Sequence, residues 1–443
     1  MRGWAIFARI AAAIILFGFG PAAALAGEAA LGVALGATTC GASTCHAASE
    51  PWPNSAVSQR EYIVWKESDP HANSWTALNS PRAKAITARL GLGAPTEQKL
   101  CLGCHALPLP PEKREESFDI TEGVTCEACH GPASAWLGVH TAGLYFYGEN
   151  LANGMYPTTD PSARADLCLG CHVGDGERFV SHNMMAAGHP TLPFELGFYS
   201  WFTKTNPENR AGYAHFTVDD DYLQRKPWPF GVKVWALGQV AQARRILELV
   251  VDPKHGPKGL FPELSHFECR ACHRSQKGPG VERVALPRIK SANILFAGFA
   301  AELVDPGLAA RIREDVEALK RRSAESWEAV IASSADLKRT LEAVEAKLKA
   351  HEFTVEDNRR SLIRIARAYQ DGRLSEYEAA EQAVLSAGSL VDELDRLDAL
   401  SAADAAAALD AMARGVSAFA SANAYSAADV RASLGEIARI AAR

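Results

Sequence analysis

The cysteines of this 443-residue chain are the residues whose types and spacing most clearly predict chemistry. All ten lie in five close pairs, and a histidine directly follows each pair. In order along the chain, the five motifs are Cys40, Cys45 and His46; Cys101, Cys104 and His105; Cys126, Cys129 and His130; Cys168, Cys171 and His172; and Cys269, Cys272 and His273. The first has the spacing C-x-x-x-x-C-H and the other four C-x-x-C-H. In such a motif the two thiols add to the vinyl groups of a porphyrin, and the imidazole becomes the proximal ligand of its iron. We therefore expect five covalent haem c groups.

Other uses of paired cysteines explain less of this pattern. A disulfide framework has no reason to require a histidine after each pair. A zinc site would not demand histidine directly after every second cysteine. Redox-active dithiols sit at helix starts in a βαβ context, which this chain lacks.

Each haem iron has a second axial position, and its occupant decides between electron transfer and ligand chemistry. Outside the five motifs the chain has eight further histidines. We predict His71, His140, His182 and His189 as distal ligands, and His215 as the fifth candidate. His255 lies in a Pro- and Gly-rich segment and is predicted to be solvated. The remaining two are His266, which is too close to the fifth motif to reach across that haem but could serve another, and His351, which is predicted to lie on the surface.

Several strings in the chain resemble the multihaem electron carriers of the cytochrome c-554 type and their larger relatives. They are CGASTCH, GVTCEACHGPASAW, SHNMMAAGHPTLPFEL and HFECRACH, and the resemblance runs from about Thr39 to Arg274. It implies closely packed, mostly bis-histidine haems that pass electrons in the periplasm. It also implies that His182 and His189 are distal ligands, and it favours His215. The chain departs from the namesake in having five motifs instead of four and a long C-terminal region without a counterpart.

The elements that position the motifs are predicted to be mainly α-helical. All five motifs fall within residues 40–273, so the porphyrins must supply much of the apolar interior of a pentahaem domain at 27–280. Frequent Gly and Pro residues predict short helices and long loops wrapped on the haems. The exception is Phe230 to Val251, a helix whose apolar stripe is predicted to face haem.

Residues 281–443 are predicted to form a C-terminal helical bundle, because this region is cysteine-free, alanine-rich and has repeated helix starts. Asp305-Pro306 is one such start. Four further starts resemble capping boxes: Thr354 with Asp357, Ser375 with Glu378, Ser401 with Asp404, and Ser426 with Asp429. The bundle is expected to cover the haem domain or to form a homo-oligomer interface.

Residues 1–26 read as a signal peptide. Arg2 and Arg9 precede an apolar run at 10–20, and Ala24-Leu25-Ala26 follows as a cleavage site. This predicts export to the periplasm as a soluble protein, and no other stretch is long enough for a transmembrane span. The net charge of −6 gives no indication of a nucleic-acid partner.

The sequence leaves two main functions open. The first is electron transport between periplasmic redox proteins, or from a membrane quinol-oxidising complex, with no catalytic residue assigned. The second is a haem enzyme that reduces or oxidises nitrite, hydroxylamine or nitric oxide at one five-coordinate iron. Pentahaem nitrite reductases place lysine after their catalytic motif, C-x-x-C-K, and this chain has no such string. We favour electron transport.

Overall fold

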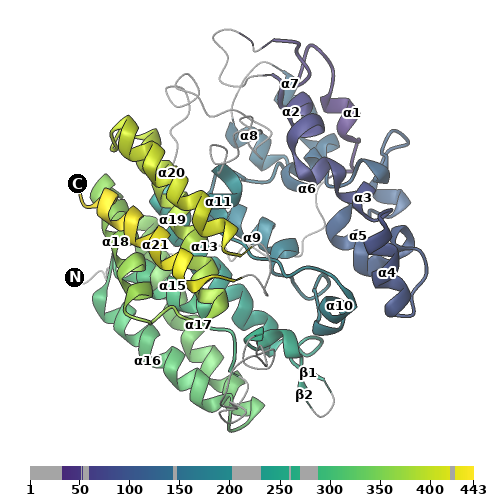
Figure 1. The fold of residues 1–443 in the computed structure, drawn as a ribbon. Coiled ribbons are helices and arrows are strands. Elements are labelled where there is room, and N and C mark those ends of the chain that lie inside the picture. Colours follow the sequence, from purple (N-terminus) through teal and green to yellow (C-terminus); the bar gives the residue numbers. More distant parts are fainter. Residues whose placement is uncertain are drawn as a thin grey trace, which may run out of the picture.

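The computed structural model describes residues 32–50, 52, 59–142, 147–201, 231–258, 261–269, 288–419 and 425–443. Within these ranges the chain is mainly α-helical, which confirms the predicted fold class, and it has one hairpin of two short strands. Short helices and loops lie on one side of the molecule, and the long C-terminal helices lie on the other (Figure 1). None of the described helices is both long and apolar enough to cross a membrane.

The region that carries the first four motifs consists of short helices joined by loops and 3₁₀ turns, as its Gly and Pro content predicts. In chain order its helices are α1 (Ala37–Cys40), α2 (Glu61–Ser68), α3 (Ser74–Ala77), α4 (Pro81–Arg89), α5 (Lys99–His105), α6 (Cys126–His130), α7 (Leu137–Thr141), α8 (Tyr147–Ala152), α9 (Pro161–His172), α10 (His182–Ala187) and α11 (Leu196–Trp201). The motif histidine is the last residue of α5, α6 and α9. Because residues three apart share a helix face, both cysteines of each of these motifs lie on the same side.

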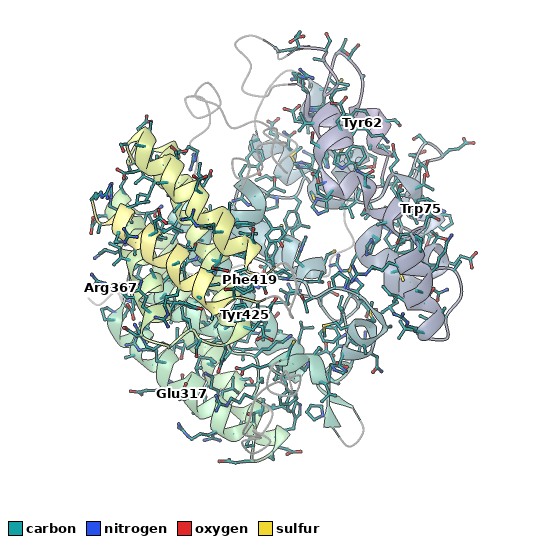
Figure 2. The ribbon with its side chains drawn as sticks, in the orientation of Figure 1. Tyr62, Trp75, Glu317, Arg367, Phe419 and Tyr425 are labelled. Atoms are coloured by element: carbon teal, nitrogen blue, oxygen red, sulfur yellow. The ribbon has the colours of Figure 1, made fainter. Side chains whose placement is uncertain are left out.

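The C-terminal region consists of longer helices. They are α13 (Gly231–Val251), α15 (Ala292–Ala301), α16 (Pro306–Arg322), α17 (Trp327–Ala350), α18 (Val355–Gln370), α19 (Tyr377–Arg396), α20 (Ala402–Ser417) and α21 (Ala427–Ala441), with the hairpin of β1 (Pro257–Lys258) and β2 (Phe261–Pro262) between α13 and α15. Aromatic side chains also join these helices, and Figure 2 shows Phe419 and Tyr425 together, with ring centroids 5.3 Å apart.

Most of the predicted helix starts are confirmed. Asp305 caps α16, and Thr354 and Asp357 form the complete capping box of α18. Ser401 and Ser426 each accept a hydrogen bond from the backbone N–H three residues on. The prediction for Ser375 and Glu378 was wrong, because α19 starts at Tyr377 with Glu376 as its N-cap. The Glu378 carboxylate instead accepts a hydrogen bond from the Cys269 backbone N–H at 3.0 Å.

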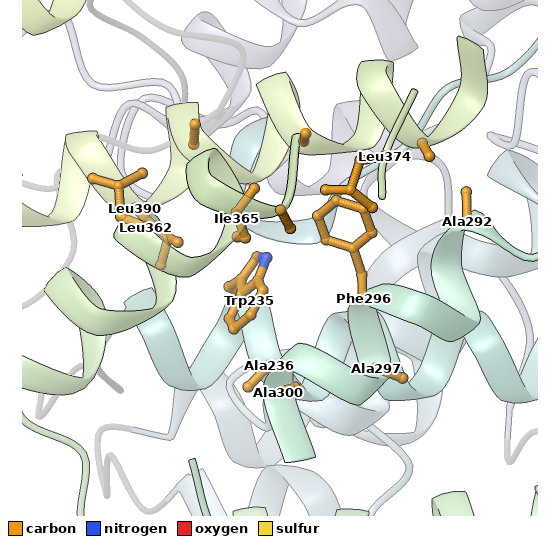
Figure 3. Packing of buried hydrophobic residues seen from close by; sticks show 14 of the residues in the cluster. Trp235, Ala236, Ala292, Phe296, Ala297, Ala300, Leu362, Ile365, Leu374 and Leu390 are labelled. Carbon is orange, nitrogen blue, oxygen red and sulfur yellow. The ribbon is translucent and has the colours of Figure 1, made fainter. Parts of the chain in front are cut away.

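Helix α13 lies at the centre of the C-terminal hydrophobic core. Its Trp235 is fully buried together with Phe296 of α15, Ile365 of α18 and Leu390 of α19 (Figure 3). The apolar stripe predicted to face haem therefore packs against the C-terminal helices instead. Another side of α13, with Val234 and Ala241, packs on α9, which carries the fourth motif. The predicted boundary after residue 280 stays a prediction, because residues 270–287 are outside the described part of the chain.

Candidate haem-binding sites

Motif histidines and predicted distal histidines meet in pairs. The ring centroids of His46 and His140 are 6.1 Å apart with an interplanar angle of 19°. Those of His71 and His172 are 6.2 Å apart with an angle of 90°. Two imidazoles that share one metal ion, each with a metal–nitrogen distance of about 2.0–2.1 Å, have centroids about 6 Å apart. Both separations therefore fit a single iron held between the two rings.

A third pair consists of His105 and His189. The pKa of His189 is lowered mainly by burial, and the nearby His105 lowers it further. A predicted distal histidine thus lies within electrostatic range of the proximal histidine of the second motif, although the two residues are far apart in the sequence.

Four of these rings have an orienting partner at Nδ1. His46 pairs with the Glu61 carboxylate at 2.8 Å, and His71 pairs with Asp69 at 2.9 Å. The other two contacts are to backbone carbonyls, from His105 to Ser74 at 2.9 Å and from His189 to Pro190 at 2.8 Å. Metal-ligating histidines commonly donate their second ring N–H to a carboxylate or a carbonyl, which fixes the tautomer and leaves Nε2 for the metal.

Asn150 gives His140 a partner of the same kind. Its amide nitrogen lies 3.5 Å from Nδ1 of His140, while its Oδ1 is buried without a hydrogen-bond partner among the described residues. Amide oxygen and nitrogen are nearly isosteric, so a half-turn of the amide lets Oδ1 accept the His140 N–H. Five of the six rings in the three pairs therefore have a partner at Nδ1, and each of these five leaves its Nε2 atom for the iron.

Burial keeps several of these imidazoles neutral, which is the protonation state that binds a metal. Burial and then the neighbouring His71 lower the pKa of His172 to about 4. Burial and then His46 lower the pKa of His140. For His71, burial opposes protonation, but the hydrogen bond and charge of Asp69 outweigh it and raise the pKa.

The motifs themselves lie close together. Cys40 of the first motif lies beside Cys126 of the third, and Cys104 of the second lies beside Cys171 of the fourth. A buried carboxylate helps to hold the first contact, because Glu127 accepts hydrogen bonds from the backbone N–H groups of Gly36 at 2.8 Å and Ala133 at 2.7 Å. Sequence reasoning missed this role, since Glu127 is simply one of the two variable residues inside a motif.

Arg178 lies across the second and fourth motifs. Its Nη1 is 3.4 Å from Cys171 Sγ, and its Nε donates to Asp175 at 2.8 Å. A Cβ built on Gly103 would lie 3.1 Å from Arg178 Cγ, and one built on Gly170 would meet the guanidinium. This packing explains why these two motifs share the sequence C-L-G-C-H, whereas the third and fifth motifs carry alanine at the same place.

Gly123 positions His71. Its φ is +79°, and an added Cβ would lie 2.7 Å from the His71 carbonyl oxygen and 2.6 Å from Ser74 Oγ.

We expect Gly123→Ala to destabilise the protein by roughly 1–3 kcal/mol through backbone strain, and we expect the clash to displace His71. Thermal unfolding measures the first effect, and the spin state of one haem measures the second. Gly91→Ala is the matched control, because Gly91 has φ +69° with nothing within 4 Å of an added Cβ. Equal effects of both variants on the haem would contradict this role of Gly123.

The structure describes some of the other predicted site residues, and the rest lie outside the described part of the chain. Nine of the ten motif cysteines are described, and all nine are partly buried: Cys40, Cys45, Cys101, Cys104, Cys126, Cys129, Cys168, Cys171 and Cys269. His130 ends α6, and His182 begins α10, where its backbone N–H donates to Glu263 at 2.8 Å. Cys272, His273, His215 and the predicted signal peptide lie outside the described residues.

Three histidines that were not predicted as ligands have defined surroundings. His255 is partly buried and stacks on Phe179 with ring centroids 4.5 Å apart, in a loop whose Pro253 and Lys254 are exposed. His266 is buried, and its Nε2 lies 2.9 Å from the His255 carbonyl. His351 follows α17 and pairs with Asp357 at 3.2 Å, with 30% of its side chain exposed. In the described part of the chain, no group of three or more His, Cys, Asp or Glu side chains is placed to hold a metal ion.

Comparison with known families supports one part of this region directly. Residues 40–131, which contain the first three motifs, match the family described as cytochrome c554 and c-prime. No curated protein and no solved structure matches the chain. The family implies covalent haem c with its iron and a role in electron transfer. The segment at 40–131 is thus similar to the cytochrome c554-like multihaem cytochromes.

Proposed function

We propose that this chain is an exported electron-transfer protein with five covalent haem c groups, at least three of them held between two histidines. Haem c, when bound, supplies an iron that changes between the ferric and ferrous states and so holds one electron. The observation that carries the proposal is the separation of 6.1 and 6.2 Å in two of the histidine pairs. The residues therefore fit the group that the motifs imply.

Each pair joins segments that are distant in the sequence. We assign His46 with His140, His172 with His71, and His105 with His189. In each pair the two imidazoles would hold the iron, and ligation by two histidines favours lower potentials than ligation by histidine and methionine. An iron held in this way would transfer electrons and would not bind a substrate.

His182 and His215 remain the predicted distal ligands for the third and fifth motifs. If a further ligand is needed, His255 is favoured over His266. The Nε2 atom of His255 is buried and has no hydrogen-bond partner among the described residues, whereas that of His266 is engaged by a carbonyl. A histidine with a free, buried Nε2 is the better candidate for an axial ligand.

The contacts between motifs support electron transfer from haem to haem within the chain. Cys40 lies next to Cys126, Cys104 next to Cys171, and Cys168 near Cys129. The attachment points of the first four motifs therefore form a connected group. Donor and acceptor are expected to be periplasmic redox proteins or a membrane quinol-oxidising complex.

Arg178 is expected to raise the reduction potentials of the haems attached to the second and fourth motifs, because its positive charge favours the reduced state, which carries one positive charge fewer. Arg178→Gln should lower both potentials, and Asp175→Asn should raise them. Arg178→Lys keeps the charge and serves as the control. Spectroelectrochemical titration measures each potential, and unchanged potentials in Arg178→Gln would contradict this role.

The electron paramagnetic resonance spectrum of the oxidised protein tests the function. A bis-histidine electron carrier shows low-spin ferric signals, and the reduced protein does not turn over nitrite, hydroxylamine or nitric oxide. A high-spin signal from one haem, together with turnover of one of these compounds, would instead support the enzyme.

A further inference from the structure

A buried carboxyl group lies where the fourth motif meets the C-terminal bundle. Glu195 immediately precedes α11 and is 0% exposed. Its carboxylate accepts hydrogen bonds from the backbone N–H groups of Gly197 at 3.1 Å and Phe198 at 2.6 Å. Burial raises the pKa of Glu195 to about 7, against the lowering effect of these donors and of the Ser389 hydroxyl. Glu195 is therefore poised between its neutral and charged forms.

The neighbours of Glu195 in the chain pack on a proximal histidine. Phe194 stacks on the His172 ring with centroids 4.8 Å apart, and Tyr199 of α11 also contacts His172, at 5.7 Å. The carboxyl group itself is directed toward Ser389 of α19. Glu195 thus connects the surroundings of the fourth haem to the bundle.

The helices around Glu195 present few charges to it. From α19, Glu393 accepts a hydrogen bond from the Gly231 backbone N–H at 2.7 Å and is paired with Arg396, and Asp392 lies on the same helix. The charged side chains of α13 are Lys233, Arg244, Arg245 and Glu248, and α11 carries one titratable residue, Tyr199. Among the described residues, no charged side chain contributes to the pKa of Glu195.

A line of polar side chains continues from Glu195 through the otherwise apolar core. On α19, Ser389, Ser386, Gln382 and Glu378 follow one another at spacings of three or four residues, so they share one helix face. The Gln382 amide donates to Gln239 of α13 at 3.1 Å. We call this line the polar seam; it consists of Glu378, Gln382, Ser386 and Ser389 of α19, and of Gln239 and Gln242 of α13.

Several atoms of the polar seam are buried without a partner in the described part of the chain. They are Gln239 Nε2, Gln242 Oε1, Ser386 Oγ, Ser389 Oγ and Glu378 Oε2. Buried polar groups of native proteins are almost always hydrogen-bonded, and ordered water satisfies those that protein atoms do not reach. Glu376, two residues before Glu378 in the chain, is 27% exposed and pairs with Arg288 at 3.6 Å, so this end of the polar seam lies near the surface. A line of water along the seam would therefore connect Glu195 to the surface.

We propose that Glu195 takes up one proton from solvent, along the polar seam, when the iron ligated by His172 accepts an electron. The inference rests on the proposed function. The electron comes from the redox partner, the iron goes from ferric to ferrous, and the Glu195 carboxylate becomes a carboxylic acid, so charge balances. The physical reason is that an electron added near a buried carboxylate in a low-dielectric surrounding disfavours the charged form.

The test compares the haem-loaded wild type with Glu195→Gln. In the wild type, the potential of the haem attached to the fourth motif should fall as pH rises above about 7, because below that pH the group is already protonated in the oxidised state. The slope approaches about 59 mV for each tenfold change in proton concentration. The reduced-minus-oxidised infrared spectrum should gain a carboxylic acid band. Glu195→Gln should abolish both the slope and the band, and an unchanged slope and band in this variant would overturn the proposal.

Two further variants sharpen the test. Ser389→Ala removes the hydroxyl that lowers the pKa of Glu195, without changing charge, so it should move the pH-dependent range upward. This variant keeps the proposal testable if Glu195→Gln does not fold. Asp357→Asn is the control, because Asp357 is a buried carboxylate on α18 in a capping box with Thr354. It should leave the pH dependence unchanged. The same titration separates failure of the proposed function from failure of this proposal. A protein without reducible haems gives no reduction potential at any pH, whereas a protein without coupled proton uptake gives a potential that does not change with pH.

Discussion

Replacing His71 by alanine is expected to convert one low-spin iron into a high-spin, five-coordinate iron. His71 is the ring that faces His172 at 6.2 Å, and no other histidine ring is placed near His172 among the described residues. An iron that loses one imidazole ligand has a weaker ligand field and an open axial position. The electron paramagnetic resonance spectrum of the oxidised variant should show one high-spin signal beside unchanged low-spin signals, and the open iron should bind added cyanide or imidazole.

His351→Ala is the matched control for this prediction. His351 is a histidine whose ring pairs with an aspartate, Asp357, as the ring of His71 pairs with Asp69, but it lies in the C-terminal bundle. Its removal should leave every haem low-spin. If His71→Ala also leaves all haems low-spin and the haem content unchanged, the pairing of His71 with His172 is wrong.

Trp235→Ala is expected to destabilise the protein by about 3–5 kcal/mol, the cost of a large cavity in a packed core. Trp235 is fully buried between α13, α15, α18 and α19, and its indole nitrogen has no hydrogen-bond partner among the described residues. The loss is therefore one of packing. Denaturant unfolding followed by far-ultraviolet circular dichroism measures the change.

Ile331→Ala provides the comparison for Trp235→Ala. Ile331 lies on α17 and is 37% exposed, so truncating it should change the free energy of unfolding by less than about 1 kcal/mol. If Trp235→Ala costs no more than Ile331→Ala, then α13 is not the central helix of the C-terminal core.

The sequence predicts those parts of the molecule that depend on local patterns. Helical periodicity and capping residues are local, so the long C-terminal helices and the capping box at Thr354 could be found without a structure. The five motifs are also local. The capping box predicted at Ser375 is not formed, because the Glu378 carboxylate accepts a hydrogen bond from the backbone of Cys269, which is far away in the chain. A local pattern could not indicate this contact.

Features that depend on tertiary contacts were not predictable. The sequence indicated that His71 and His140 are ligands, but not which proximal histidine each one faces, because each pair joins distant segments. The orienting residues Glu61 and Asn150 carry no motif. Likewise, the apolar stripe of α13 has the same periodicity whether it packs on porphyrin or on helices, so only the structure could place it in the bundle core.

The intact mass of the exported protein, measured after denaturation, tests the central claim most directly. We expect the mass of the chain from Gly27 plus five haems, with no thiol that reacts with an alkylating agent, because five haem c groups would occupy all ten cysteines as thioethers. Fewer than five haems, with the corresponding free thiols or disulfides at one of the motifs, would contradict a pentahaem cytochrome.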